Sequence, residues 1–318
     1  MNSVLITGAS GYIGATLSIY LKSKGFKVYA LCRTISDDLV EKFKDIEIII
    51  GDIASDETIS KLISLDVRCV IHTVSLDHKQ SEISSVETVN NINVLPVWRL
   101  ADQFLRKGIE KFLYLSTIQV LGSLTKGVLN EDAIKAPSNS YGLTHSIGEE
   151  LISFYNEKSV AHFCSVRLSN GYGAPVFKDN NCWWLVINDL CRMAFREKKI
   201  VLQSDGTAVR DFIHINDIAK AIHCILENNS LTDTLYHVSS SRTVSLLEVA
   251  HQIKKVYFNK YNEILPIFIS GTIISDSVSA SKASYVIDNT RLLKTGYSAE
   301  IDLEQGIPDI FNYLEHEY

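Results

Sequence analysis

Short apolar runs alternate with amphipathic stretches along this chain of 318 residues. The apolar runs are bounded by polar residues or glycine and predict buried strands, at 4–6, 27–31, 47–50, 67–72, 111–116 and 162–168. Helical periodicity predicts helices between them, at 15–21, 86–106 and 141–155. Pro96 lies inside the second helix and predicts a kink or a break there. Because strands and helices alternate without repeats, we expect an α/β fold with a doubly wound parallel sheet.

The pattern changes after Gly173, where short strands, helices and loops become mixed. We therefore expect two units: a nucleotide-binding domain, 1–173 with about 209–235, and a smaller mixed α/β substrate-binding lobe, 174–208 with 236–318. Such a lobe would cover the carboxyl edge of the sheet, where open α/β folds bind their substrates.

Three glycines follow the first predicted strand and precede the first helix. Gly8, Gly11 and Gly14 have the spacing G-x-x-G-x-x-G. A nucleotide pyrophosphate must approach bare backbone at a helix N-terminus, where N–H groups and the helix dipole favour an anion. A side chain at Gly8 or Gly11 would obstruct that approach, and Gly14 lets the helix lie close to the strand. The alternative is a purely structural glycine turn.

The end of the second strand bears on the choice of dinucleotide. An acidic residue usually binds the ribose 2′-hydroxyl there, whereas an arginine can accommodate a 2′-phosphate. Cys32 and Arg33 occupy this position, so we favour NADP(H) over NAD(H). Asp37 and Asp38 could fold back to the ribose, and Arg33 could be a solvated loop charge. Asp52, after the third strand, could accept from an adenine amino group or cap the next helix.

Composition narrows the class of protein. Hydrophobic residues make up 46% and charged residues 21%, and the formal net charge is −6, so no overall basic field favours nucleic acid or anionic lipid. No apolar run is long enough to span a bilayer, and no targeting segment precedes the first strand. The six cysteines are scattered without metal-ligand spacing, so we expect a cytoplasmic protein without a bound metal.

Eight ordered motifs identify a family. They are TGASGYIG (7–14), GDI (51–53), VIHTVS (70–75), Asn93, YLSTIQVLG (114–122), PSNSYGLTH (137–145), RLSNGYG (167–173) and RDFIHINDIAKAI (210–222). Together they resemble the extended short-chain dehydrogenase/reductases that act on nucleotide sugars, the epimerase/dehydratase family. The resemblance implies a Rossmann-type fold, a nicotinamide cofactor and a nucleotide-diphosphate sugar as substrate.

The resemblance also assigns roles residue by residue. Tyr141 would exchange the proton of a sugar hydroxyl, Thr117 would hydrogen-bond the same oxygen, and His145 would complete the catalytic set. Taken alone, Tyr141 and Thr117 would read as a helix-start aromatic and a strand-end hydroxyl. The implied cofactor-binding residues are Gly8, Ser10, Gly11, Tyr12, Ile13, Gly14, Arg33, Asp52, Ile53, Thr73, Val74, Ser75, Asn93, Ser116, Tyr141 and His145.

One position departs from the family pattern. The family has Y-x-x-x-K, whereas this chain has Y-G-L-T-H, with His145 in place of the lysine. The lysine lowers the pKa of the tyrosine and binds the nicotinamide ribose. A histidine is mostly neutral at pH 7, so it supplies less positive field, although it could still donate to a ribose hydroxyl. Three alternatives follow: a slower enzyme of the usual type, an enzyme using another base, or a catalytically silent dinucleotide-binding relative with a regulatory role.

The residues after Thr117 restrict the reaction. In the dehydratase branch an Asp-Glu pair follows the catalytic threonine, and this chain has Ile118 and Gln119 instead. Epimerase-reductases of the fucose-synthase type have a cysteine two residues after the hydroxyl, where Gln119 stands. The remaining reactions are reduction of a 4-keto sugar and 4-epimerisation; the Cys32-Arg33 pair tilts the choice slightly towards reduction.

Substrate contacts follow from charge and from the resemblance. Arg210 would bind the diphosphate, unless it pairs with Asp211 or Asp217. Thr117, Asn170 and Asn188 match positions near the sugar and its phosphates. Other polar and aromatic residues fit structural roles better: a buried structural cation at Arg167, fold residues at His72 and His214, and core aromatics at Trp183 and Trp184.

The family usually dimerises through two helices of each subunit, which form a four-helix bundle. The corresponding segments here are about 88–106 and 141–157. We therefore expect a homodimer whose apolar contact surface includes Trp98, Phe104, Leu151 and Phe154.

Overall fold

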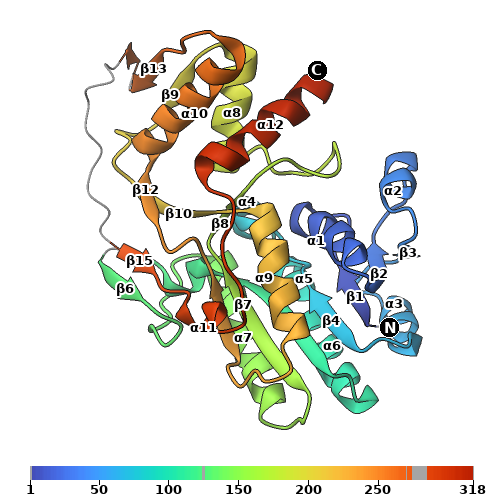
Figure 1. The fold of residues 1–318 in the computed structure, drawn as a ribbon. Helices are drawn as coiled ribbons and strands as arrows, with labels where there is room; N and C mark the ends of the chain where they lie inside the picture. Colours follow the sequence, from blue (N-terminus) through green and yellow to red (C-terminus); the bar gives the residue numbers. More distant parts are fainter. Residues whose placement is uncertain (1, 124–125, 270, 274–284, 318) are drawn as a thin grey trace.

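The computed structural model describes residues 2–123, 126–269, 271–273 and 285–317. Its centre is a seven-stranded sheet in the order β11-β7-β5-β4-β1-β2-β3, in which every pair of neighbours is parallel (Figure 1). The strands are β1 (Ser3–Thr7), β2 (Lys27–Cys32), β3 (Glu47–Ile50), β4 (Cys69–His72), β5 (Lys111–Thr117), β7 (His162–Leu168) and β11 (Leu235–Val238). The predicted doubly wound parallel sheet is confirmed.

Helices cover both faces of this sheet because strand residues alternate in direction. Val4 and Ile6 of β1 belong to a core with the inward sides of α1 and α9, whereas Leu5 belongs to a core with α3, α6 and α7. The helices around the sheet are α1 (Tyr12–Ser23), α2 (Asp37–Lys42), α3 (Asp56–Ser64), α4 (His78–Ile83), α5 (Val86–Asn93), α6 (Leu95–Lys107), α7 (Ser140–Asn156), α9 (Ile215–Glu227) and α11 (Thr290–Leu293).

The predicted helix 86–106 is broken, as Pro96 indicated. It forms α5 and α6, and Pro96 lies in the first turn of α6, where a missing N–H costs no helical hydrogen bond. Phe104 of α6 does not lie on an outer apolar surface as expected. Its exposed fraction is 0%, because it faces the sheet and packs in the core.

The second lobe has a core of its own. Helices α8 (Val186–Glu197), α10 (Leu246–Tyr261) and α12 (Leu303–Glu317) pack together and group at the top of the molecule in Figure 1. Strands β9 (Ile200–Leu202), β13 (Ile267–Ile269) and β14 (Thr272–Ile273) form a small sheet beside them. Residues 270 and 274–284 of the predicted lobe lie outside the described residues.

Two further small sheets complete the described fold. Strand β10 (Val209–His214) pairs with β8 (Asn170–Tyr172) and β12 (Thr243–Ser245). Strand β6 (Gly127–Leu129) pairs with β15 (Tyr285–Ile287), and the 3-10 turn η1 (Ile118–Leu121) follows β5. The position at which we expected the lobe to resume, residue 236, lies inside β11 of the central sheet.

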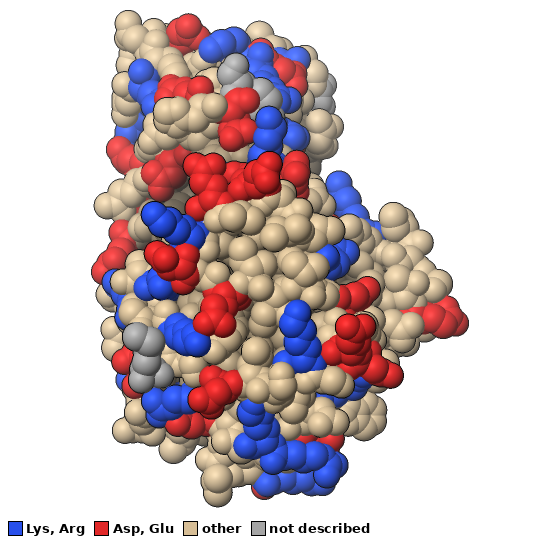
Figure 2. All heavy atoms as spheres, turned by 90° about the vertical axis from the view of Figure 1, so that its right-hand side faces the viewer, with Lys and Arg blue, Asp and Glu red and all other residues tan. Residues whose placement is uncertain are grey.

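The surface carries charges of both signs. On the face shown in Figure 2, Lys and Arg side chains are interspersed with Asp and Glu side chains, and acidic residues form a band across the upper part. Within the described chain, no helix has the length and apolarity that crossing a membrane requires. The same residues contain no group of three or more His, Cys, Asp or Glu side chains suited to a metal ion.

Candidate active site

The turn between β1 and α1 leaves backbone groups open to a ligand. Gly8 has φ +71°, and a Cβ atom there would lie 2.8 Å from Oγ1 of Thr73. A Cβ atom at Gly14 would overlap the carbonyl oxygen of Gly8. Gly11 is the N-cap of α1, which has no side-chain cap and no acidic residue in its first turn. These features fit a dinucleotide pyrophosphate, because the first N–H groups of α1 can bind its oxygens.

Hydrogen bonds hold the loops around this glycine turn. Oγ1 of Thr73 donates to the carbonyl of Thr7 at 2.7 Å, and the hydroxyl of Tyr12 donates to the carbonyl of Gly173 at 2.9 Å. Asn188 is fully buried and binds Gly173 twice, through Nδ2 to the carbonyl (2.8 Å) and through Oδ1 from the N–H (3.2 Å). The amide of Asn188 therefore fixes the loop after β8, and both of its polar atoms have protein partners.

The segment 174–182 crosses the glycine turn, a feature that the sequence did not predict. Nδ2 of Asn180 donates to the carbonyl of Ser10 at 2.8 Å. Nζ of Lys42, in α2, donates to the carbonyl of Val176 at 2.6 Å. This part of the predicted substrate lobe thus lies against the predicted cofactor loop. The pairing joins residues far apart in sequence, and no local pattern announces it.

The end of β2 carries the residues expected to select the dinucleotide. Cys32 is buried, and a hydrogen bond links its thiol to Ser10, while Arg33 is exposed. Asp37 and Asp38 form the first turn of α2, and Asp38 pairs with Lys42 one turn later at 3.0 Å. The two carboxylates therefore stabilise the start of α2.

Asp52 has a local partner in the loop after β3. Its Oδ1 accepts from the N–H of Ala54 at 2.9 Å, whereas Ser55 is the N-cap of α3. The helix-capping alternative for Asp52 does not hold, since its bond lies before the helix begins. Among the remaining expected cofactor residues, the apolar ones are buried or partly buried against the core, namely Ile13, Ile53 and Val74. Ser75 donates to the carbonyl of Leu76 at 2.7 Å.

Asn93 and Ser116 bind protein groups beneath the site. Oδ1 of Asn93 accepts from the N–H of Leu76 at 2.8 Å, and its Nδ2 donates to Oγ1 of Thr144 at 3.1 Å. Oγ of Ser116 donates to Oε1 of Glu149 at 2.6 Å. The side chains of these two expected cofactor residues therefore join α5, α7 and β5.

The start of α7 brings the predicted catalytic residues together. Asn139 caps this helix by accepting from the N–H of Gly142 at 2.7 Å. A Cβ atom at Gly142 would lie 2.6 Å from the carbonyl oxygen of Gln119, so the first turn of α7 packs closely on η1. As a result Tyr141 reaches the end of β5, where Thr117 hydrogen-bonds its hydroxyl.

The electrostatic environment keeps Tyr141 protonated. Burial raises the pKa of Tyr141 to about 12, and the nearby carboxylate of Asp77 adds to this increase. The hydrogen bond from Thr117 acts in the opposite direction but does not compensate. At neutral pH the side chain is therefore a phenol that can donate a proton.

His145 lies one helical turn after Tyr141 and is 2% exposed. Its Nδ1 lies 2.9 Å from the carbonyl oxygen of Tyr141, and the two ring centroids are 4.3 Å apart. Burial lowers the pKa of His145 to about 4, so the ring is neutral at pH 7. The structure thus brings His145 to the tyrosine but gives it no positive charge there.

A buried ion pair lies one turn further along α7. Glu149 and Arg167 form two hydrogen bonds of 2.8 Å each, and Arg167 is 2% exposed. The guanidinium lowers the pKa of Glu149 despite its burial. The sequence had suggested a buried structural cation at Arg167 but had missed Glu149. The only sequence feature that pointed to Glu149 was its spacing, because Tyr141, His145 and Glu149 follow at intervals of four and so lie on one helical face.

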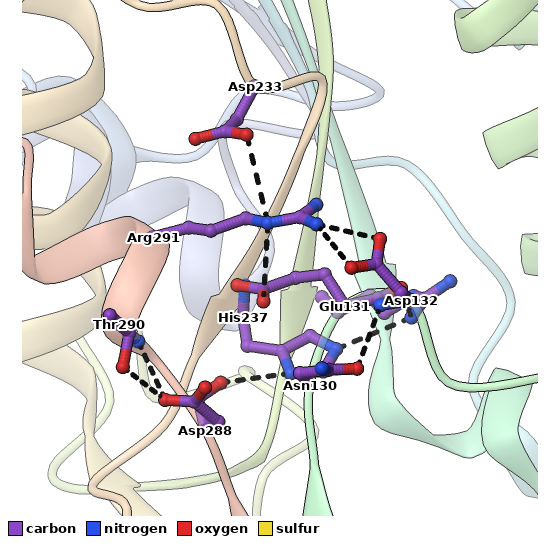
Figure 3. A network of polar contacts seen from close by, with 9 residues as sticks. Asn130, Glu131, Asp132, Asp233, His237, Asp288, Thr290 and Arg291 are labelled. Atoms are coloured by element: carbon purple, nitrogen blue, oxygen red, sulfur yellow. Dashed lines mark hydrogen bonds and ion pairs between the residues drawn. The ribbon is translucent and has the colours of Figure 1, made fainter.

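Figure 3 shows how the polar contacts continue towards the C-terminal part of the chain. Arg167 donates to the carbonyl of Glu131 and to Nε2 of His237, whose Nδ1 donates to the carbonyl of Asp288. Arg291 pairs with Glu131 at 3.7 Å, and also binds two neighbouring aspartates, Asp132 and Asp233. The network anchors α11 against the loop before α7 and, through Arg167 and Glu149, against α7 itself.

The expected diphosphate residue Arg210 is exposed, and its Nη1 donates to the carbonyl of Val209 at 3.0 Å. Asp211 and Asp217 accept from other backbone and serine groups, so the alternative ion pair with Arg210 is absent from the described chain. Asn170 is partly buried, and its Nδ2 donates to the carbonyl of Asp211 at 2.8 Å. Arg210 and Asn170 come from the paired strands β10 and β8, and Asn170 is in register with Phe212, two residues after Arg210.

The histidines and tryptophans assigned to the fold have partners there. His72 shares a hydrogen bond of 2.8 Å with Thr7, and His214 is the N-cap of α9. Burial lowers their pKa values to about 3 and about 4. Trp183 packs against the core of the second lobe, as expected. Trp184 is 37% exposed, so the expectation of a core aromatic there was wrong.

A parallel sheet with an open glycine turn and a Tyr–Thr pair at its carboxyl edge defines a dinucleotide-binding protein of the short-chain dehydrogenase/reductase type. The sequence profile of the NAD dependent epimerase/dehydratase family matches residues 4–239. The chain belongs to this family, which confirms the resemblance seen in its motifs.

Individual relatives agree with this assignment along nearly their whole length. The chain is 24% identical to the low-salt glycan biosynthesis protein Agl12 of Haloferax volcanii, covering 98% of this chain and 97% of that protein. It is 23% identical to a putative UDP-glucose 4-epimerase of Methanocaldococcus jannaschii, covering 98% of each. Among solved structures, MoeE5 in complex with UDP-glucuronic acid and NAD superposes with a TM-score of 0.81 at 23% identity over 100% of both chains. UDP-glucuronic acid 4-epimerase of Bacillus cereus, with UDP-glucuronic acid and NAD, gives 0.81 at 20% identity over 99% and 100%.

Proposed function

We propose that this protein is an NAD(P)-dependent oxidoreductase that transfers hydride at a carbon of a nucleotide-diphosphate sugar. The observation that carries the proposal is the Tyr141–Thr117 pair at the end of β5, two strands from the glycine turn after β1. The carboxyl ends of parallel strands meet at one sheet edge, so both features face the same ligand space. A nicotinamide dinucleotide held at the glycine turn supplies or accepts the hydride. The family relationship and the relatives' UDP-sugar complexes support this substrate class.

The protonation of Tyr141 favours the reductive direction. The phenol donates its proton to a carbonyl oxygen of the sugar while hydride arrives at the carbonyl carbon, and the product is an alcohol. Thr117 holds the same oxygen in place. We therefore favour reduction of a 4-keto sugar. The alternative is 4-epimerisation, which begins with an oxidation and needs Tyr141 as the phenolate.

Dehydration is disfavoured because no carboxylate follows Thr117. Ile118 is buried, and Oε1 of Gln119 accepts from Nδ2 of Asn139 at 3.1 Å. An amide cannot take the proton that water elimination releases. This reasoning holds although dTDP-D-glucose 4,6-dehydratases are among the relatives, for example a protein of Dictyostelium discoideum with 25% identity.

For the cofactor we propose NADP(H) in preference to NAD(H). Arg33 is exposed at the end of β2, where it can bind a 2′-phosphate, and Cys32 replaces the usual carboxylate. Asp38 is paired with Lys42 rather than turned towards the strand end. NAD, which the relatives' complexes contain, is the alternative.

For the substrate we propose binding between the sheet edge and the smaller lobe, 174–208 with 236–318. Arg210 would pair with the diphosphate, and Asn170 lies on the neighbouring strand, in register with Phe212. Asn188 would act indirectly by fixing the loop at Gly173.

We also propose a cytoplasmic homodimer built on α6 and α7. Several apolar side chains on these helices are exposed, among them Trp98 (53%), Leu143 (51%) and Phe154 (47%). Helices α6 and α7 pack against each other and can present these side chains on one face. Light scattering should give twice the chain mass, and the substitution Trp98→Glu should give a monomer that still binds dinucleotide. A wild-type monomer would contradict the dimer.

The test begins with identification of the nucleotide that the purified protein releases on denaturation, by mass spectrometry. Retained NAD(H) favours epimerisation, whereas NADP(H) or an empty site favours the reductase. Purified protein is then incubated with NADPH or NADH and UDP- or dTDP-linked 4-keto sugars, and sugar products are identified. Binding of dinucleotide without turnover of any sugar would support the silent relative. Failure to bind added dinucleotide would overturn the whole proposal.

A further inference from the structure

The fold fixes which nitrogen of His145 carries the proton. Nδ1 lies 2.9 Å from the carbonyl oxygen of Tyr141, the residue one turn earlier on α7. A carbonyl oxygen only accepts hydrogen bonds, so Nδ1 must be the donor. In a neutral imidazole the other nitrogen, Nε2, then has a lone pair and no proton. Among the hydrogen bonds of the described residues, that of Nδ1 to the carbonyl of Tyr141 is the one that His145 makes, and Nε2 has none.

Neighbouring rings keep the imidazole in this orientation. Tyr114 of β5 stacks on His145 with centroids 5.9 Å apart, and on His72 of β4 with centroids 6.1 Å apart. The helix lies so close to Tyr114 that a Cβ atom at Gly148 would approach its ring to 2.5 Å. Rotation of the His145 ring by half a turn would place a carbon against the carbonyl of Tyr141 and lose the hydrogen bond. One edge of the ring is therefore bound to the helix, and Nε2 is on the other edge.

The charged groups around His145 do not favour an imidazolium. Glu149, one turn further on the same helix, is already neutralised by Arg167 and also faces Lys135 at 3.4 Å. From β4, His72 is neutral as well, and from α7 itself Tyr141 is a phenol. Burial dominates, so the ring stays neutral over the range in which an ordinary histidine would titrate.

We infer that His145 is a hydrogen-bond acceptor in the cofactor site. Its Nε2 would accept a hydrogen bond from a hydroxyl of the nicotinamide ribose. The inference rests on the proposed function, since it takes a nicotinamide dinucleotide as the ligand. It reverses the polarity that the resemblance implied, because the lysine of the family donates to the ribose. The donor role that the sequence left open for His145 is the alternative.

The pH dependence of dinucleotide binding distinguishes a neutral acceptor from a charged donor. An acceptor that is neutral throughout gives dinucleotide binding that does not change between pH 5.5 and 8.5, apart from the titration of the ligand itself. A charged donor would lose affinity as the pH rises past its pKa. Either kind of contact uses a ribose hydroxyl of the ligand, so removing that hydroxyl tests whether Nε2 makes the contact at all.

The tautomer can be measured directly in the free protein by ¹⁵N–¹H correlation of the histidine rings. The signals of His145 are assigned by their loss in the His145→Gln variant, and the exposed His316 serves as the control ring. We expect a protonated Nδ1 and an unprotonated Nε2 at pH 7, without change down to pH 5.5. A protonated Nε2 at pH 7 would overturn the inference.

Ligand binding is tested by calorimetry with NADP⁺ and with an analogue that lacks one nicotinamide-ribose hydroxyl. Removing the relevant hydroxyl should weaken binding to the wild type about fivefold, the value of one ordinary hydrogen bond. It should not weaken binding to His145→Leu, in which the acceptor is missing. His145→Gln retains an acceptor oxygen and should recover part of the loss, and thermal melting checks that each variant is folded. His145→Lys adds a positive charge at the proposed site, and His316→Lys adds the same charge at an exposed position. Comparing the two variants separates a local effect of the charge on binding from a general one.

The outcomes separate this inference from the proposed function. Equal hydroxyl effects in the wild type and in folded His145→Leu would overturn the acceptor role. If neither the wild type nor His145→Lys binds any dinucleotide, the proposed function fails, and the tautomer measurement still reports on the ring itself.

Discussion

The glycine turn after β1 and the first turns of α7 lie at the same edge of the sheet but meet different requirements. In the proposed function the glycine turn would bind through backbone N–H groups and through the absence of Cβ atoms, and Gly8, Gly11 and Gly14 retain both features. The start of α7 works through side-chain charge, and there the family lysine is replaced by a neutral, buried His145. Cofactor binding and proton transfer can therefore vary independently in one chain.

The difference also explains which state of Tyr141 is ready for reaction. A cation a few Å from the phenol would stabilise the phenolate by about 1–4 kcal/mol at effective dielectric constants of 80 to 20. Without it, burial decides, and the pKa of Tyr141 rises to about 12. A site with this tyrosine is prepared to donate a proton rather than to accept one. The predictions below separate the two regions.

The largest effect is expected for Tyr141→Phe. Loss of the proton donor should lower the turnover number by about 10²–10⁴-fold, the usual range for a general acid. Dinucleotide affinity should stay within about twofold, because the glycine turn is unaffected. Steady-state kinetics and calorimetry measure the two quantities. The control is Tyr155→Phe on the same helix, whose hydroxyl faces Asp102 away from the site. Substantial activity in Tyr141→Phe would show that another group supplies the proton.

Gly14→Ala should damage the other region. The new methyl group would overlap the carbonyl oxygen of Gly8, so the turn must open and its N–H groups must move. We expect dinucleotide affinity to fall about 100-fold or more, as for loss of several hydrogen bonds at once. The control Gly25→Ala also changes a glycine near α1, but its Cβ atom would meet nothing within 4 Å. Because Gly25 has φ +86°, that control should cost about 1 kcal/mol of stability and no affinity. Unchanged binding by Gly14→Ala would exclude this turn as the cofactor site.

The sequence predicted the glycine turn well and the electrostatics of α7 poorly. Gly8 to Gly14 are contiguous, and a strand and a helix flank them, so local pattern defines the geometry. The break at Pro96 was predictable for the same reason. The tautomer of His145 depends instead on a carbonyl of its own helix, on the ring of Tyr114 and on burial, which are known only once the chain is folded.

Contacts between distant segments were likewise outside the reach of the sequence. Glu149 and Arg167 come from α7 and β7, and the hydrogen bond of Asn180 to Ser10 joins residues 170 positions apart. Phe104 was misplaced because the apolar side of α6 was assigned to a partner subunit rather than to the sheet. Apolar residues on a helix indicate burial, but they do not tell which surface does the burying.

A smaller effect should follow from restoring charge with His145→Lys. In the direction of alcohol oxidation the phenolate of Tyr141 is required, so the wild-type rate should rise about tenfold per pH unit between pH 7 and 9, below the pKa of about 12. The lysine lowers that pKa, so the rate at pH 7 should increase about tenfold and level off earlier. Rates of the reductive direction should be flat over this range in the wild type. The control His316→Lys should reproduce the wild-type profile. An oxidation rate independent of pH in the wild type would contradict the protonated tyrosine.

The smallest effect is expected for Arg33→Ala, at the end of β2. This substitution tests the choice between NADP(H) and NAD(H), which the glycine turn does not determine. The pyrophosphate that the turn is proposed to bind is common to NAD(H) and NADP(H), so we expect selection between them to come from the residues after β2. If Arg33 pairs with the 2′-phosphate, its loss should weaken NADP⁺ binding about fivefold to tenfold, since an exposed pair with phosphate contributes about 1 kcal/mol. NAD⁺ binding should stay within about twofold of the wild type. The effect should shrink as salt is raised, because the pair is open to solvent. Arg106→Ala, which removes an exposed arginine paired with Asp102, is the matched control and should change neither affinity. Equal losses of affinity for both dinucleotides would place Arg33 at the shared pyrophosphate. No loss for either would mean that Arg33 does not take part in dinucleotide recognition, and NAD(H) would then be the expected cofactor.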